Sequence, residues 1–137
     1  MSIFTTEITS ENIPSDNPLH HRLLCAYVFS EKYIFGDVLE LGCGEGRGIE
    51  TILKKCNSYT AIDKINTVID NLSSKYKEHN FFVSNFPPFD KIDDDSYDTI
   101  ISFQVIEHIE DDKLFVSEIK RILRPGGLAL ISTPNIR

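Results

Sequence analysis

Four glycines follow an acid in one short stretch of the sequence, VLELGCGEGRG at residues 38–48. Glu40 precedes Gly42, Gly44 and Gly46, which occupy alternate positions. A glycine-rich turn between a strand and a helix lets the backbone approach a ligand closely and points amide N–H groups at it. The chemistry that such a turn favours is the binding of a phosphate, a dinucleotide or another small cofactor.

The register of the glycines separates these ligands. The phosphate-binding loop of nucleoside triphosphatases requires Gly-x-x-x-x-Gly-Lys followed by Ser or Thr, and no such pair follows these glycines. A dinucleotide-binding turn requires Gly-x-Gly-x-x-Gly. Its last glycine would fall on Arg47 when counted from Gly42, and on Ile49 when counted from Gly44. The sequence instead has the pattern acid-x-Gly-x-Gly-x-Gly.

Further polar side chains of interest lie at the ends of later apolar runs. Asp63 ends one such run, where an acid can accept both hydroxyls of a ribose. Gln104, Glu107 and His108 are spaced i, i+3, i+4 and would share one face of a helix. His108 is a candidate general base, because an imidazole titrates near neutral pH.

The elements that must position these residues follow from the spacing of the apolar side chains. Five strands are predicted, at 37–41, 58–63, 80–84, 99–104 and 128–134. Four helices are predicted, at 19–35, 47–56, 67–78 and 111–123. Strands that alternate with helices form a parallel sheet with helices on both faces, and ligands bind beside the carboxyl ends of its strands. The glycine turn, Asp63 and Gln104 all lie at those ends.

Composition limits the class of protein. The 137 residues suit one domain, with a loosely held lead-in at 1–18 and a core at 19–137. No apolar run could span a membrane and no secretory signal begins the chain, which predicts a cytoplasmic protein. The net charge is −7 with dispersed basic residues, which argues against duplex nucleic acid as a partner. The three cysteines have neither zinc-binding nor disulfide spacing, and we expect reduced, mostly buried thiols.

Four ordered stretches resemble the class I S-adenosylmethionine-dependent methyltransferases, of the type 11 and type 12 kind. The stretches are DVLELGCGEG, AIDK, SYDTIISFQVIEHIED and ILRPGGLALISTPN. The resemblance covers about residues 19–135. It implies a three-layer αβα, Rossmann-like α/β fold with five parallel strands in the order 3-2-1-4-5.

The resemblance implies S-adenosyl-L-methionine as the cofactor and S-adenosyl-L-homocysteine as the product. In the family the glycine turn lies against the methionine part, a contact that falls here to Glu40, Gly42, Cys43 and Gly44. Glu40 would contact the amino group, since a carboxylate beside an ammonium favours both ionised forms. Asp63 would bind the ribose. The alternatives are a turn needed only for packing and an aspartate that caps the next turn.

Residues after the third and fourth strands complete the implied site. Asn85 stands where the family usually has an aspartate that accepts from the adenine amino group, and its side-chain oxygen can still accept that bond. Phe86 would pack on the adenine. Phe103 and Gln104 are assigned to the methionine end, where an aromatic ring favours the cationic sulfur, with a core position as the alternative for Phe103. Arg22 would pair with the cofactor's carboxylate.

The segment QVIEHIED is similar to the E-x-x-E-H segment of metal-assisted O-methyltransferases. Here Gln104 replaces the first glutamate, and a neutral amide is a poorer ligand for a hard cation. Glu107 and His108 alone are too few ligands for a metal site. We therefore predict no metal, and a structural or substrate-facing His108.

The implied reaction is in-line methyl transfer to an oxygen, nitrogen or carbon nucleophile of a small-molecule acceptor. The alternatives are a non-catalytic module that binds S-adenosylmethionine and an NAD-binding protein. The family's sheet has seven strands, the last two forming a hairpin, whereas this chain stops after the fifth. An unpaired fifth strand exposes an apolar edge. Either a second copy or another partner covers that edge, or the chain is a fragment of a longer protein.

Overall fold

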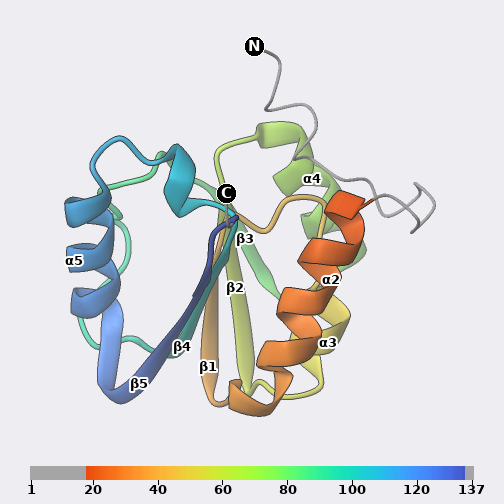
Figure 1. The fold of residues 1–137 in the computed structure, drawn as a ribbon, viewed down its shortest axis with the longest axis horizontal. Helices are drawn as coiled ribbons and strands as arrows, with labels where there is room; N and C mark the ends of the chain where they lie inside the picture. The colour runs from red at the N-terminus through yellow and green to blue at the C-terminus, as the bar shows by residue number, and fades with distance from the viewer. Residues whose placement is uncertain (1–17, 135–137) are drawn as a thin grey trace.

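A five-stranded parallel sheet organises residues 18–134, the part of the chain that the computed structural model describes (Figure 1). Its strand order is β3-β2-β1-β4-β5, which confirms the predicted order 3-2-1-4-5. The strands are β1 (Asp37–Leu41), β2 (Ser58–Asp63), β3 (Asn80–Val83), β4 (Tyr97–Phe103) and β5 (Leu123–Ser132). The predicted lead-in lies outside the described residues, except for its last residue.

Helices cover both faces of the sheet (Figure 1). They are α2 (Pro18–Ser30), α3 (Ile49–Leu53), α4 (Asn66–Lys75) and α5 (Asp112–Ile122), with single 3₁₀ turns η1 (Glu31–Tyr33) and η2 (Ile106–His108). Helices α2, α3 and α4 pack on one face and α5 on the other. The predicted helix over 19–35 is shorter than expected, because α2 ends at Ser30 and the chain then tightens into η1.

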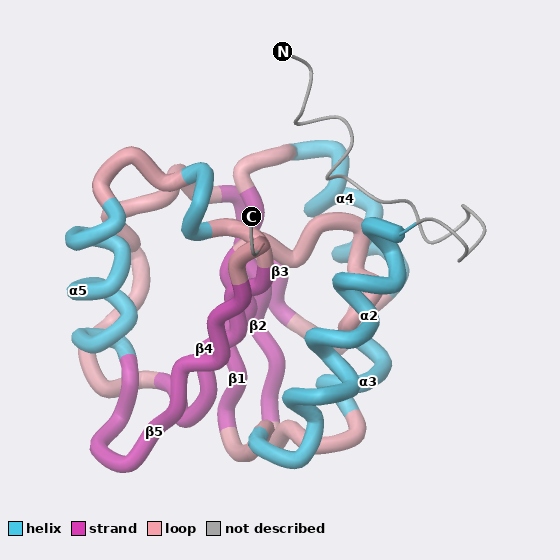
Figure 2. Tube along the Cα trace, in the orientation of Figure 1, coloured by secondary structure: helices cyan, strands magenta, loops and turns pink. Residues whose placement is uncertain are grey.

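Residues of β1 alternate between two apolar cores. Val38 packs in the core under α2, α3 and α4, whereas Leu39 and Leu41 pack in the core under α5. Both faces of β1 are therefore buried, as parallel sheets require. The loops that follow the strands gather at one end of this sheet, which is the upper end in Figure 2.

The segment RPGG, at 124–127, differs from its prediction. The helix before it ends at Ile122 as expected, but β5 begins directly afterwards and contains RPGG. Strand β4 pairs Tyr97 with Leu123 and then Thr99 with Leu128, so RPGG bulges between the two pairs. Gly126 has φ +84, a left-handed conformation that lets the chain make this detour.

Strand β5 is one edge of the sheet, and its side chains remain partly open to solvent. Leu128 and Ile131 are 41% and 40% exposed. A partner over this edge stays a prediction.

The cysteines are unpaired as expected, but only Cys43 is buried, while Cys25 is exposed and Cys56 is half-buried. The expectation of mostly buried thiols was therefore wrong, because Cys25 lies on the solvent side of α2.

Candidate functional site

A cavity of about 470 Å³ opens at the carboxyl ends of β1, β2 and β4. This volume lies in the range of small-molecule sites. Residues from the glycine turn, from the ends of β2 and β4, from the loop after β3 and from α2 line the cavity. The predicted site residues among them are Gly42, Cys43, Gly44, Asp63, Asn85, Phe86, Phe103, Gln104 and His108. Arg22 and Glu40 are not among the described residues that line it.

The backbone at Gly44 is open to the cavity. Gly44 has φ +54, and a Cβ added there would meet no atom within 4 Å. A Cβ at Gly42 would instead lie 2.5 Å from Cγ2 of Val105, so that glycine is required by packing. The space over Gly44 is thus available to a ligand that lies directly on the main chain.

Asp63 joins the end of β2 to the glycine turn. Its Oδ2 accepts a hydrogen bond from the backbone N–H of Gly44 at 3.0 Å, and its Oδ1 accepts from that of Ile65 at 3.1 Å. The residue is 8% exposed and lines the cavity. Each carboxylate oxygen has a further lone pair, so Asp63 can accept two more donors from a ligand.

Glu40 is buried, does not line the cavity and is enclosed by two tyrosines. The hydroxyl of Tyr27 donates to its Oε2, and the hydroxyl of Tyr59 donates to its Oε1 at 2.5 Å. Burial raises the pKa of Glu40 to about 7, although the two tyrosine hydrogen bonds act in the opposite direction. Tyr27 itself lines the cavity. The predicted contact between Glu40 and a cofactor stays a prediction.

The end of β4 supplies an aromatic wall. The Phe103 ring meets the Tyr27 ring edge to face, with centroids 4.9 Å apart. Phe103 belongs to the buried core and also lines the cavity, so its core position is compatible with the predicted contact with the cofactor, which stays a prediction. Aromatic contacts of this geometry stabilise a fixed orientation of both rings.

The segment after β4 does not form the helix that would align Gln104, Glu107 and His108. Gln104 has φ +56 and donates its backbone N–H to the carbonyl of Ser132 at 2.9 Å. Only Ile106–His108 is helical, as the turn η2. The left-handed residue redirects the chain, and His108 lines the cavity while Glu107 does not.

The remaining predicted residues lie on the loop after β3 and on α2. Asn85 is exposed at the cavity, and the Phe86 ring beside it contacts the rings of Phe89 and Phe115, with centroids 5.2 and 6.4 Å away. Arg22 is exposed on α2, and its predicted role stays a prediction.

Residue types alone did not mark every residue of the cavity. Leu23 and Tyr27 of α2 line it together, as the i, i+4 spacing on one helix face allows. Ile65 lines it two residues after Asp63. The i, i+4 spacing on the first helix was the signal that could have marked Leu23 and Tyr27. Closeness in sequence to Asp63 was the signal for Ile65.

Two kinds of feature are absent from residues 18–134. This part of the chain contains no group of three or more His, Cys, Asp or Glu side chains placed to hold a metal ion. None of its helices combines the length and the apolar character needed to cross a membrane.

A family model described as "Methyltransferase domain" matches residues 39–131. A protein of Mycolicibacterium smegmatis named "Probable S-adenosylmethionine-dependent methyltransferase" is 39% identical over 99 residues, which are 72% of this chain and 38% of that protein. The ubiquinone biosynthesis O-methyltransferase of Rickettsia conorii is 31% identical over 103 residues, covering 72% of this chain and 35% of that enzyme. The chain thus spans little more than a third of the length of these relatives.

Solved structures share the fold. The N-methyltransferase NodS from Bradyrhizobium japonicum, in complex with S-adenosyl-L-homocysteine, has a TM-score of 0.72 and 18% identity, covering 95% of this chain and 70% of that one. A protein in complex with the Trm112 methyltransferase activator of Haloferax volcanii has a TM-score of 0.70 and 24% identity, covering 80% of this chain and 50% of that one. At these identities the likeness concerns the fold alone.

Proposed function

This chain belongs to the S-adenosylmethionine-dependent methyltransferases, and we propose that its cavity binds S-adenosylmethionine for methyl transfer to a small-molecule acceptor. The observation that carries the proposal is the open backbone at Gly44, hydrogen-bonded to the carboxylate of Asp63. When bound, S-adenosylmethionine supplies an activated methyl group on a cationic sulfur.

The residues of the cavity fit the three parts of that cofactor. Asp63 accepts the two ribose hydroxyls through its remaining lone pairs. The Asn85 side chain accepts from the adenine amino group, and Phe86 packs against the base. The open main chain at Gly44 and the side chain of Gln104, which both line the cavity, would hold the methionine part. A cavity of about 470 Å³ suits a ligand of this size.

Methyl transfer requires no nucleophile on the protein, so these residues act by position. Phe103 presents a buried aromatic wall that favours a cation and excludes water. A fixed donor and a fixed acceptor in near-attack geometry supply much of the rate. His108, which lines the cavity, would accept the proton of a hydroxyl acceptor. An oxygen acceptor agrees with the named O-methyltransferases among the relatives.

Calorimetric titration with S-adenosylmethionine, S-adenosylhomocysteine and NAD tests the cofactor. We expect both sulfur compounds to bind and NAD not to bind. Gly44→Ala fills the open space and weakens binding. Gly126→Ala is the matched control, because Gly126 also has positive φ and an open Cβ position but lies in the β5 bulge. Binding of NAD without either sulfur compound would refute the proposal.

Radiolabelled methyl transfer into a metabolite extract tests the reaction and finds the acceptor. We expect S-adenosylhomocysteine to form together with one labelled product, and His108→Ala to slow that product if the acceptor atom is a hydroxyl oxygen. Binding of the cofactor without any turnover, also in a longer form of the protein, would favour a non-catalytic module.

A further inference from the structure

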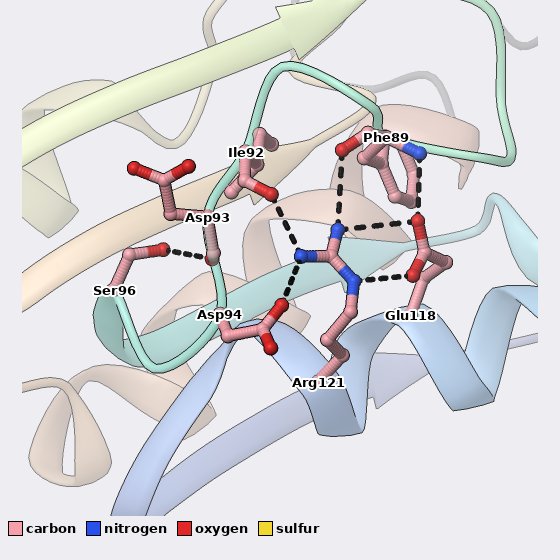
Figure 3. Close-up of polar contacts among 7 residues, drawn as sticks. All are labelled: Phe89, Ile92, Asp93, Asp94, Ser96, Glu118 and Arg121. Carbon is pink, nitrogen blue, oxygen red and sulfur yellow. Dashed lines mark hydrogen bonds and ion pairs between the residues drawn. The ribbon is translucent and has the colours of Figure 1, made fainter.

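The side chain of Arg121 reaches from α5 into the loop between β3 and β4, residues 84–96 (Figure 3). Its Nη1 donates to the carbonyl of Ile92 at 2.8 Å and to Asp94 at 2.7 Å, and its Nη2 donates to the carbonyl of Phe89 at 3.1 Å. One guanidinium therefore holds three points of a loop that has no strand or helix of its own. Such a planar fork fixes geometry as well as charge.

Glu118, one turn earlier on α5, completes the attachment. Its two oxygens accept from Arg121, from Nε at 2.6 Å and from Nη2 at 3.2 Å, and its Oε1 also accepts the backbone N–H of Phe89 at 2.9 Å. Both backbone polar groups of Phe89 are thus bound to α5 (Figure 3). The Arg121 hydrogen bond holds the pKa of Glu118 below its ordinary value, so the acceptor stays anionic at neutral pH.

The attached loop carries Asn85 and Phe86, which line the cavity. Phe89 is buried, and its ring packs edge to face on Phe86 with centroids 5.2 Å apart. Phe86 also stacks on Phe115 of α5, with centroids 6.4 Å apart and planes 17° from parallel. Phe86 and Asn85 line the cavity. The contacts run without a break from Arg121 and Glu118, through Phe89, to the cavity wall.

We propose that Arg121 and Glu118 are positioning residues, which set the loop after β3 so that Asn85 and Phe86 meet the adenine of the cofactor. Neither side chain lines the cavity. The identity of the ligand rests on the proposed function, whereas the attachment of the loop does not. If the pair only stabilised the fold, its removal would weaken the binding of every part of the cofactor alike.

The variants are Arg121→Gln and Glu118→Gln, with Arg124→Gln as the matched control. Arg124 also bonds two carboxylates, Asp37 at 2.8 Å and Asp98 at 2.9 Å, but at the amino ends of β1 and β4. Glu118→Gln keeps an acceptor for the Phe89 N–H and removes the charge, so it remains informative if Arg121→Gln does not fold.

Hydrogen exchange of the ligand-free protein tests the attachment itself. We expect exchange in 84–96 to become at least about tenfold faster in Arg121→Gln, since the loss of even one of its three charge-assisted hydrogen bonds to the loop predicts that increase. Glu118→Gln should give a smaller increase in the same segment. Arg124→Gln should leave the segment unchanged. Equal exchange of 84–96 in Arg121→Gln and in the unmodified protein would overturn the proposal.

Base discrimination tests the positioning role. The probes are S-adenosylhomocysteine and its purine analogue, which lacks the 6-amino group. We expect the unmodified protein and Arg124→Gln to prefer the adenine compound about fivefold, the size of one neutral hydrogen bond, and Arg121→Gln to lose this preference. An affinity ratio that does not change in Arg121→Gln overturns the proposal. An unmodified protein that binds neither compound refutes the proposed function, while the exchange data still decide the attachment.

Discussion

Two carboxylates at the ends of neighbouring strands have opposite surroundings. Glu40 of β1 is 1% exposed, bonded to two tyrosine hydroxyls and absent from the cavity wall. Asp63 of β2 lines the cavity and bonds only to backbone N–H groups. Glu40 is thus enclosed by interior side chains, whereas Asp63 borders the cavity. Hydrogen-bond partners, rather than position in the motif, set the surroundings of each carboxylate.

Helix α2 causes this difference. The Tyr27 ring lies directly over Gly48, where an added Cβ would come 1.9 Å from it. Only glycine at that position lets α2 approach the turn closely enough for the Tyr27 hydroxyl to reach Glu40. Gly48 therefore permits the contact between Tyr27 and Glu40. Gly44 instead donates its backbone N–H to Asp63.

Asp63→Ala gives the largest expected effect. The variant loses the proposed ribose contacts and the acceptor for two backbone N–H groups. Because hydrogen bonds to a charged group contribute about 1.5–3 kcal/mol each, we expect S-adenosylhomocysteine to bind at least about a hundredfold more weakly. Calorimetric titration measures the loss, and Asp63→Asn, which keeps one oxygen, should fall between. Unchanged affinity in Asp63→Ala would remove the distinction between the two acids.

Glu40→Gln should change the pH dependence of stability. The folded protein holds the pKa of Glu40 at about 7, above its ordinary value of 4.5, so folding takes up a proton between these values. The contribution of Glu40 to the free energy of unfolding is complete below pH 4.5 and is lost as pH rises through 7. We expect the unmodified protein to lose about 3 kcal/mol of unfolding free energy between pH 4.5 and 8 relative to Glu40→Gln.

Urea unfolding of both proteins at pH 4.5, 6 and 8 measures this difference. The comparison cancels groups with lowered pKa such as Asp37 and Glu118, whose contributions are lost at acid pH. If the unfolding free energies of the two proteins changed with pH in parallel, the pKa of Glu40 would be ordinary and its carboxyl would be in contact with solvent.

Cys43 gives the smallest expected effect and compares the two acids directly. The pKa of the Cys43 thiol is raised above its ordinary value, and burial is the largest cause. The negative charge of Glu40 is the second cause, and that of Asp63 is the third. Since only the thiolate reacts with a disulfide reagent, Glu40→Gln should raise the labelling rate of Cys43 about twofold and Asp63→Asn by less. Initial rates with the exposed Cys25 and the half-buried Cys56 both replaced by serine test this order. A larger effect of Asp63→Asn would reverse it.

The sequence predicted the sheet well because its signals are local. Apolar runs ending in Gly or Asp placed β1 and β2 at 37–41 and 58–63, where the structure has them. The glycine register and Asp63 also come together as expected. The helical arrangement that would align Gln104, Glu107 and His108 does not form, because Gln104 is left-handed and donates its backbone N–H to the carbonyl of Ser132 on β5. No pattern near Gln104 reports on that distant carbonyl.

The sequence by itself determined the alternation of strands and helices, the family and the strand ends at which a ligand can bind. These features depend on the periodicity of apolar residues and on the spacing of glycines, which are local properties of the sequence. Only the tertiary structure decided that Glu40 is closed by Tyr27 and that Glu118 is buried against Arg121 and Phe89. A charged residue is buried only where its hydrogen-bond partners converge, and residues distant in the chain converge only once the helices pack on the sheet.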